Sequence, residues 1–296
     1  MKPLFDSNNY LPTINGLIGD KLAENRDPWA IPMSFRTEGR DVSIAELGLR
    51  LKGSRVAVLV HGLMADERIW KKFVGLDQDL NVLHLRYNSG LHISENGQIF
   101  AALLESLHDR LQIKKVYLVG HSMGGLVVRS ACHYGRKKRH HWLKCTRDIF
   151  LIAVPNAGAP LEKLGHVTAR VLNRIKWHLG TIGNLLEKRS NGIKDLRHGS
   201  MLDEDWNSPG AHSGNRHPVP PIPGIRYHVL VGTLSKDEKS LMAKYFGDGL
   251  ITQQSAVGAT LLHLSNVKVL VKTGHNSILS HPEAIRCVRK ALQRDG

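Results

Sequence analysis

Val116-Tyr-Leu-Val-Gly-His-Ser-Met-Gly-Gly-Leu-Val-Val128 is the stretch of this chain that decides its fold. An apolar run leads into the pattern Gly-x-Ser-x-Gly at 120–124, and a second apolar run follows it. This order predicts a strand, a sharp turn and a helix, which together form a nucleophile elbow. The turn strains the serine backbone, and glycines flank it because side chains there would collide. The sequence therefore predicts an exposed Ser122 hydroxyl at a helix N-terminus, where the helix dipole favours a developing negative charge.

Strands and helices alternate on both sides of this elbow. Continuous apolar runs predict buried strands at 55–60, 82–86, 116–119, 149–154, 227–231 and 267–271. A hairpin around Gly39 precedes them, and apolar residues at helical spacing predict a helix over 94–111. Pro282 and Glu283 suit the first turn of a closing helix. This alternation predicts an α/β fold in a single domain over 1–296, with a mostly parallel central sheet and helices on both faces.

The interval 160–224 lies between two predicted strands and is long. Its first half carries an apolar stripe at helical spacing, and its second half is polar, rich in turns and ends in Pro218-Val-Pro-Pro-Ile-Pro223. The stripe consists of Leu164, Val167, Val171, Leu172, Ile175 and Leu179. Helices inserted between two sheet strands predict a helical cap over the serine. The alternative is an ordinary crossover helix followed by a long surface loop.

Composition is that of an ordinary globular protein, 42% hydrophobic and 23% charged. The three cysteines, Cys132, Cys145 and Cys287, include no Cys-x-x-Cys pair, which argues against a disulfide framework or a zinc knuckle. The N-terminus lacks the apolar core of a signal peptide, and no stretch approaches about 18 uncharged apolar residues. We therefore expect a cytoplasmic protein without a transmembrane segment.

The net charge of +15 raises the question of an anionic partner. Its densest run, Arg136-Lys-Lys-Arg139, follows the predicted end of the helix that begins at the elbow. Cations at a helix C-terminus are favourable for local reasons, so a solvated helix end explains the run. Contact with an anionic lipid surface is the alternative. No recognition helix or basic motif with interleaved aromatic residues supports nucleic-acid binding, so we expect no nucleic-acid partner.

A serine nucleophile for acyl transfer needs a base, an acid that orients the base and an oxyanion hole, and the chain order Ser, Asp/Glu, His is common on α/β sheets. His275 lies just beyond the last predicted strand, where a loop can place its imidazole over Ser122. Asp248, in a glycine turn after the strand at 227–231, is the expected acid. The competing residues are His263, His281 and Asp237.

The expected oxyanion hole consists of two backbone amides. One is the amide of Met123, directly after the nucleophile, and the other is that of Leu63 in Val60-His-Gly-Leu-Met64, where the first buried strand ends. Gly62 lets this backbone approach a substrate closely. A donor of this kind contributes roughly 3–4 kcal/mol to transition-state stabilisation.

Sequence motifs for metals and cofactors are missing from the chain. It has no His-Glu-x-x-His pattern, no phosphate-binding loop and no glycine-rich dinucleotide fingerprint. His140 and His141 are adjacent, so their side chains diverge in most backbones. We expect no metal and no cofactor, and the expected partner is a small-molecule ester or lipid substrate.

Five ordered segments carry a resemblance to a known family. They are His61-Gly-Leu63, Gly120-His-Ser-Met-Gly-Gly125, Val154-Pro-Asn-Ala-Gly-Ala-Pro160, Asp248-Gly-Leu-Ile251 and Gly274-His-Asn276. With these segments the chain resembles bacterial lipases and esterases related to the GPI inositol-deacylase group of α/β-hydrolases. The resemblance implies an α/β-hydrolase fold, carboxylic-ester hydrolysis, a triad of Ser122, Asp248 and His275, and Leu63 and Met123 as oxyanion donors. Asn156 departs from the pattern, because relatives commonly carry His there.

These patterns together indicate a serine esterase or lipase that forms an acyl-enzyme intermediate. A thioesterase, an amidase or an acyltransferase would use the same residues and is the first alternative. A lipid-binding protein without activity on the same scaffold is the second alternative, and an intact, ordered triad argues against it.

Overall fold

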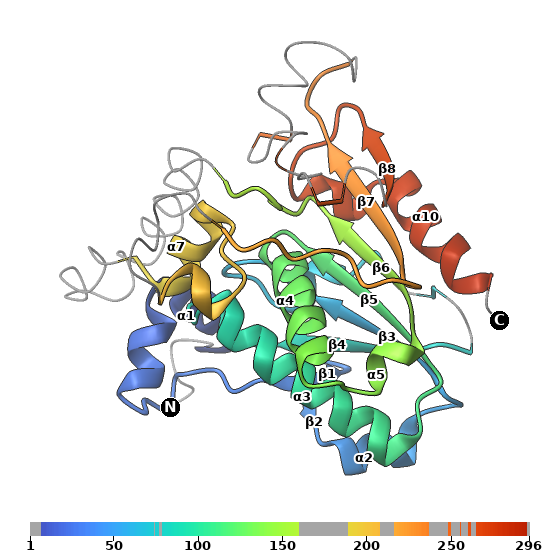
Figure 1. Ribbon diagram of the computed structural model, residues 1–296, viewed down its shortest axis with the longest axis horizontal. Helices are drawn as coiled ribbons and strands as arrows, with labels where there is room; N and C mark the ends of the chain where they lie inside the picture. Colours follow the sequence, from blue (N-terminus) through green and yellow to red (C-terminus); the bar gives the residue numbers. More distant parts are fainter. Residues whose placement is uncertain are drawn as a thin grey trace, which may run out of the picture.

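A computed structural model of the chain describes residues 7–73, 75–76, 79–159, 189–207, 216–236, 248–249, 255, 260–261 and 265–294. Its centre is an eight-stranded sheet in the order β2-β1-β4-β3-β5-β6-β7-β8 (Figure 1). The strands are β1 (Ser34–Thr37), β2 (Arg40–Val42), β3 (Arg55–Val60), β4 (Asn81–Arg86), β5 (Lys115–His121), β6 (Thr146–Ile152), β7 (Arg226–Gly232) and β8 (Ser265–Leu270). β1 runs antiparallel to β2 and β4, and all pairings from β4 to β8 are parallel. The predicted α/β fold with a mostly parallel sheet is confirmed.

Helices cover both faces of this sheet (Figure 1). The α-helices are α1 (Ser7–Glu24), α2 (Ile44–Arg50), α3 (Ile93–Leu111), α4 (Met123–Lys137), α5 (Trp142–Cys145), α7 (Asn191–His198) and α10 (Pro282–Gln293). Short 3-10 helices are η1 (Glu67–Trp70), η3 (Asp203–Asp205) and η4 (Ser277–Ser280). Among the described residues, no helix is both long and apolar enough to cross a membrane.

Alternation of side chains along each strand produces two hydrophobic cores. In β3, Val58 belongs to the core that contains Phe100 of α3 and Leu126 of α4. Its neighbour Leu59 points to the other face and belongs to the core that contains Val288 of α10. Both faces of the sheet are therefore buried, which explains why its strands read as continuous apolar runs.

The interval 160–224 is described at 189–207 and 216–224. The apolar stripe between Leu164 and Leu179, on which the predicted cap depends, lies outside the described residues. Within the described part, the Ser190 hydroxyl donates to the backbone oxygen of Gly16 at 2.7 Å, which ties the start of α7 to α1. Helix α7 lies at the start of the half that was expected to be polar and rich in turns, and the sequence did not predict this helix.

A buried carboxylate joins β6 to β7. Asp148 is fully buried and accepts two hydrogen bonds from the guanidinium of Arg226, at 2.8 and 2.7 Å. The His228 Nε2 lies 2.7 Å from the same carboxylate. Burial alone would raise the pKa of the Asp148 carboxyl, but the hydrogen bonds from His228 and Arg226 outweigh it and hold that pKa below its usual value.

We expect the substitution Asp148→Asn to lower the free energy of unfolding by about 2–3 kcal/mol at pH 7, because it removes the charge that both neighbours face. The matched control is Asp41→Asn, whose carboxylate contacts Arg36 and Arg86 at the surface and should cost under about 1 kcal/mol. Because the pKa of Asp148 is lowered, its contribution is present at neutral pH and is lost as the pH falls below about 4. Urea unfolding at pH 7 measures both variants, and equal losses would contradict the prediction.

Candidate active site

The elbow is built at the junction of β5 and α4. Ser122 lies between the end of β5 and the first residue of α4, with φ 54° and ψ −128°. A Cβ atom on Gly120 would lie 2.5 Å from the Cα of Gly125, and one on Gly124 would lie 2.3 Å from the backbone oxygen of His61. Both glycines are therefore required by close backbone contacts, as the sequence pattern predicts.

Ser122 contacts His275, and His275 contacts Asp248. The His275 Nε2 lies 3.0 Å from the Ser122 Oγ, and its Nδ1 lies 2.9 Å from a carboxylate oxygen of Asp248. The backbone amide of His275 also donates to the backbone oxygen of Asp248 at 3.0 Å. Asp248 is buried, with a side chain 2% exposed, whereas that of His275 is 14% exposed. A carboxylate at Nδ1 favours the tautomer whose Nε2 can accept the serine proton.

The competing residues lie elsewhere. His281 caps α10, where its Nδ1 accepts a hydrogen bond from the backbone amide of Glu283 at 3.2 Å. His263 and Asp237 lie outside the described residues. Among the residues that the structure describes, only Asp248 and His275 of the candidate acids and bases form a connected chain of contacts with Ser122.

The backbone of Gly62 lies against Ser122. A Cβ atom on Gly62 would lie 3.0 Å from the Ser122 Cβ, so the loop after β3 approaches the elbow closely. Met64 follows in a left-handed conformation at φ 59°, and its amide donates to the Ser89 hydroxyl at 3.1 Å. The amides of Leu63 and Met123 donate no hydrogen bond within the described part of the chain. Neither amide therefore has a competing acceptor among the described residues.

Two buried histidines support this site, and the sequence analysis did not assign them a role. The His121 Nε2 lies 3.0 Å from the backbone oxygen of His275, so His121 contacts the loop that carries His275. The His61 ring stacks on Tyr87 with centroids 4.3 Å apart, and the Tyr87 hydroxyl donates to the backbone oxygen of His61 at 2.7 Å. The sequence carries one signal for these contacts, because His121 directly precedes Ser122 and His61 directly precedes Gly62.

Burial keeps both imidazoles neutral. It lowers the pKa of His61 to about 4, and together with the nearby charge of His275 it lowers the pKa of His121 to about 3. An unfolded histidine takes up a proton near pH 6.5, so the unfolded state binds more protons as the pH falls below that value. The stabilisation from each neutral ring is therefore present above pH 6.5 and is lost in acid.

We expect the free energy of unfolding to fall by about 2 kcal/mol for each of these two histidines between pH 7 and pH 5. Urea unfolding across this range measures the loss. The variant His121→Gln should be less stable at pH 7 but should show a smaller difference between the two pH values. An unchanged difference would mean that His121 does not contribute.

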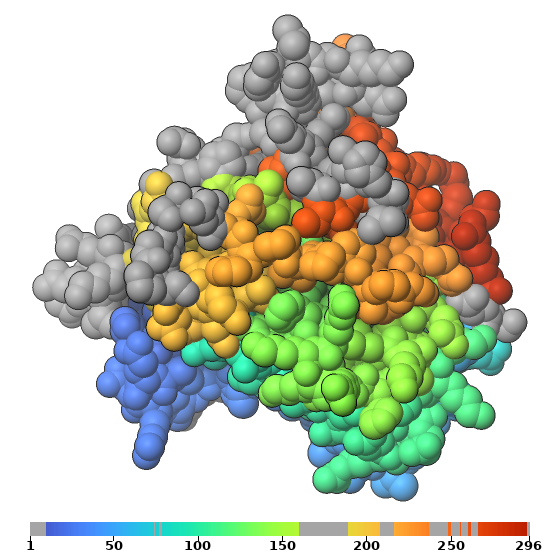
Figure 2. Space-filling view, in the orientation of Figure 1, coloured from blue at the N-terminus to red at the C-terminus, as the bar shows by residue number. Residues whose placement is uncertain are grey.

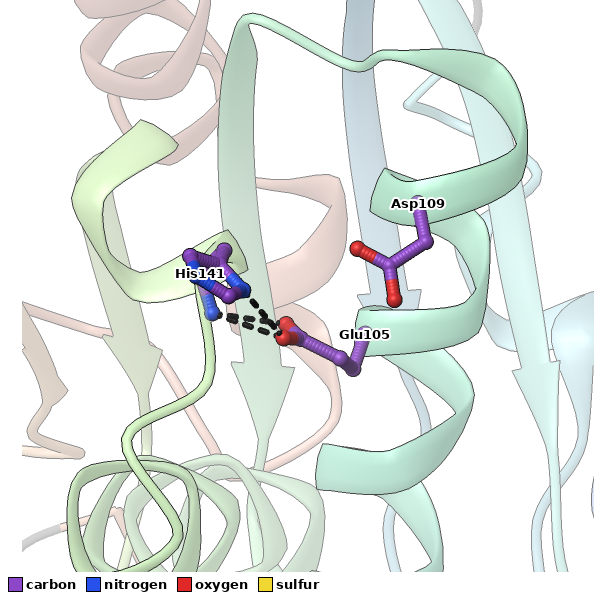
Figure 3. A group of neighbouring side chains, drawn as sticks. All are labelled: Glu105, Asp109 and His141. Carbon is purple, nitrogen blue, oxygen red and sulfur yellow. Dashed lines mark hydrogen bonds and ion pairs between the residues drawn. The ribbon is translucent and has the colours of Figure 1, made fainter.

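One cluster of possible metal ligands lies away from the elbow, between α3 and α5 (Figure 3). Glu105, Asp109 and His141 each place one ligand atom within 4.8 Å of the others. The Glu105 carboxylate is already engaged, because it accepts hydrogen bonds from the backbone amides of His141 and Trp142 and contacts the His141 ring at 2.8 Å. These bonds join the start of α5 to α3 and account for the close approach of Glu105 and His141.

Comparisons with known proteins place this geometry in context. The sequence profile of the Alpha/beta hydrolase family matches residues 57–286. The chain is similar to the mature form of the lipase BlEst2 of Bacillus licheniformis, with 17% identity, a TM-score of 0.53, and coverage of 88% of this chain and 98% of that one. It is also similar to a structure from a study of carboxylesterases of the thaumarchaeon Nitrososphaera gargenis, with 14% identity, a TM-score of 0.51, and coverage of 89% and 96%. No curated protein matches the chain.

Proposed function

We propose that this chain, which belongs to the alpha/beta hydrolase family, is a serine-dependent hydrolase of carboxylic esters, an esterase or lipase. The observation that carries the proposal is the position of His275 between two partners, 3.0 Å from the Ser122 Oγ and 2.9 Å from the Asp248 carboxylate. A nucleophile, a base within reach of its proton and an acid that orients the base are what acyl transfer requires.

In the first half of the reaction, Ser122 becomes acylated. His275 takes the hydroxyl proton at Nε2 while the Ser122 Oγ attacks the ester carbonyl carbon. The Leu63 and Met123 amides donate hydrogen bonds to the oxyanion that forms. Asp248 stabilises the resulting imidazolium through Nδ1. His275 then gives its proton to the leaving alcohol, and the acyl-enzyme remains.

In the second half, water releases the acid. His275 takes a proton from a water molecule, which attacks the acyl carbon, and the same two amides bind the second oxyanion. Collapse of this intermediate returns the proton from His275 to the Ser122 Oγ and frees the carboxylic acid. The histidine thus alternates between base and acid, and the tautomer that Asp248 favours is the one that both halves need.

The finer family assignment is also a proposal. The ordered segments around His61, Ser122, Asp248 and His275 support a relationship to the bacterial lipases and esterases of the GPI inositol-deacylase group. Asn156 is the departure from that pattern, and its side-chain oxygen accepts a hydrogen bond from Arg129 at 2.7 Å.

Rates on p-nitrophenyl esters from acetate to palmitate, beside a matching anilide and a matching thioester, test the proposed activity. We expect the ester of the best chain length to be cleaved faster than the anilide or the thioester of the same acyl group. Faster cleavage of the thioester or the anilide would replace the proposal with a thioesterase or an amidase. No turnover of any of these compounds would contradict acyl transfer to water.

We further propose that 160–224 forms a cap within a single domain. In that case Val171 and Ile175 line an acyl pocket and lie near the surface. Ile175→Asp should then lower activity on decanoate, spare acetate and cost under about 1 kcal/mol of stability. A crossover helix would bury the charge and cost several kcal/mol, with equal loss on both substrates. Urea unfolding beside acetate and decanoate kinetics separates the two outcomes.

A further inference from the structure

Arg129 is a buried cation that the proposed reaction does not use. It lies in the second turn of α4 after Ser122, and only 3% of its surface is exposed. Its guanidinium donates to the Asn156 Oδ1 at 2.7 Å, to the Thr260 hydroxyl at 2.9 Å and to the backbone oxygen of Val219. All three acceptors are neutral, so the positive charge has no counterion among them. A buried charge without a partner of opposite sign is costly.

A second arginine, Arg216, bonds to the same residue as Arg129. The Arg216 Nη1 donates to the backbone oxygen of Asn156 at 3.2 Å, so both guanidinium groups bond to one residue. A Cβ atom on Gly199 would lie 2.6 Å from this Nη1, and Gly199 therefore leaves the room that Arg216 occupies. In the described part of the chain, neither arginine pairs with a carboxylate. The charge of Arg216 adds to burial in lowering the pKa of Arg129, to about 10.

The two arginines line a cavity of about 200 Å³. Its other lining residues include Asn156, Gly199, His217 and Thr260. Residues 216–219 form one side of it. The orange segment that leads into β7 passes across α4 in Figure 1, and its atoms form the orange band above the green atoms in Figure 2. The lining residue His217 faces a carboxylate, that of Asp205, which accepts from its backbone amide at 2.8 Å and contacts its ring at 3.1 Å. The cavity therefore combines space for a small molecule with two positive charges that pair with no carboxylate of the described residues.

We propose that this cavity is a binding site for the phosphate group of a small phosphomonoester or of inorganic phosphate. Arg129 lies seven residues after Ser122 along α4, about 10 Å by helical rise, so the site is distinct from the nucleophile. The Thr260 hydroxyl accepts from Arg129 and donates to no acceptor among the described residues, so its hydrogen can bond to a ligand. Two guanidinium groups and a hydroxyl supply the charge and the donors that a dianionic phosphate requires.

Calorimetric titration of the intact protein at constant ionic strength tests this site, with inorganic phosphate, sn-glycerol 3-phosphate and acetate as probes. Arg216→Gln should weaken phosphate binding about tenfold or more, because charge-assisted hydrogen bonds are lost. The matched control is Arg110→Gln, which removes an arginine from the last turn of α3 and should leave the affinity unchanged. Arg129→Gln should abolish binding. If the Arg129→Gln variant does not fold, Arg216→Gln still decides the test, because Arg216 lies at the surface and its replacement should not prevent folding.

Each outcome has a defined meaning. Tighter binding of sn-glycerol 3-phosphate than of phosphate identifies a phosphomonoester as the ligand, and equal binding identifies the free ion. The proposal is overturned if no phosphate binding occurs, if acetate binds as tightly, or if Arg110→Gln loses as much affinity as Arg216→Gln. These titrations do not depend on catalysis, so they are independent of the outcome of the ester assays.

Discussion

Replacement of Ser122 by alanine is expected to lower kcat on p-nitrophenyl esters by roughly five to six orders of magnitude, judged from the loss of the serine in another triad. The change removes the attacking oxygen and leaves the rest of the elbow in place. KM should change little, because acyl and alcohol contacts remain. The melting temperature should stay close to that of the unmodified protein, because the Oγ contacts only His275 among the described residues.

Ser130→Ala provides the matched control for this prediction. Ser130 lies in the same helix and is fully buried, and its hydroxyl donates to the backbone oxygen of Met201 at 2.7 Å. That variant should lose about 1 kcal/mol of stability and keep its kcat within a few-fold. A Ser122→Ala variant that retained a tenth of the activity would contradict the assignment of Ser122 as the nucleophile. Labelling by a serine-directed phosphonate at another residue would do the same.

The central sheet could be predicted from the sequence because its strands are buried on both faces. Such strands are continuous apolar runs, and the run at 55–60 has the same bounds as β3. The elbow could be predicted for a related reason. A Cβ atom on Gly120 would collide with the backbone of Gly125 in the same turn, and this local restriction is part of the sequence pattern. A Cβ atom on Gly124 would instead collide with the backbone of Val60 and His61, so that glycine also depends on a neighbouring strand.

Helix α1 could not be predicted in this way, because its own sequence favours a helix weakly. It contains Pro12, Gly16 and Gly19, and its backbone kinks at Ile18. Contacts made far along the chain hold it in place. A Cβ atom on Gly19 would lie 1.9 Å from the side-chain oxygen of Asn88, whose amide donates to the backbone oxygen of Gly19 at 2.8 Å. Such contacts exist only in the folded chain.

Some residues of the candidate site could be predicted from the sequence and others could not, for the same reason. Motifs and the ends of strands predicted Ser122, Asp248 and His275 as candidate site residues, and the structure brings these three side chains into contact. His121 contacts the backbone oxygen of His275, which lies 154 positions further along the chain. Arg129 donates to Val219 and Thr260, which lie 90 and 131 positions further along the chain. Periodicity and spacing carry no signal for pairs so distant in the chain.

Replacement of Asp248 by asparagine is the second substitution with a large expected effect, a loss in kcat of roughly 10⁴-fold by analogy with a protease triad. The asparagine amide can donate to Nδ1 of His275, and this favours the tautomer that carries its proton on Nε2. A protonated Nε2 cannot accept the proton of Ser122. Kinetics on p-nitrophenyl acetate at pH 7, with KM and kcat determined separately, measure the loss, which should fall on kcat.

The structure gives a reason why this variant should keep its geometry. The backbone amide of His275 donates to the backbone oxygen of Asp248 at 3.0 Å, and the His121 ring contacts the backbone oxygen of His275, so neither contact needs the carboxylate. The loop that carries His275 should therefore stay in place, and the loss of activity should reflect the tautomer alone. Asp237→Asn is the control and should cost little. If Asp237→Asn lost the activity and Asp248→Asn kept it, the acid would be Asp237, and the contact between Asp248 and His275 would be structural.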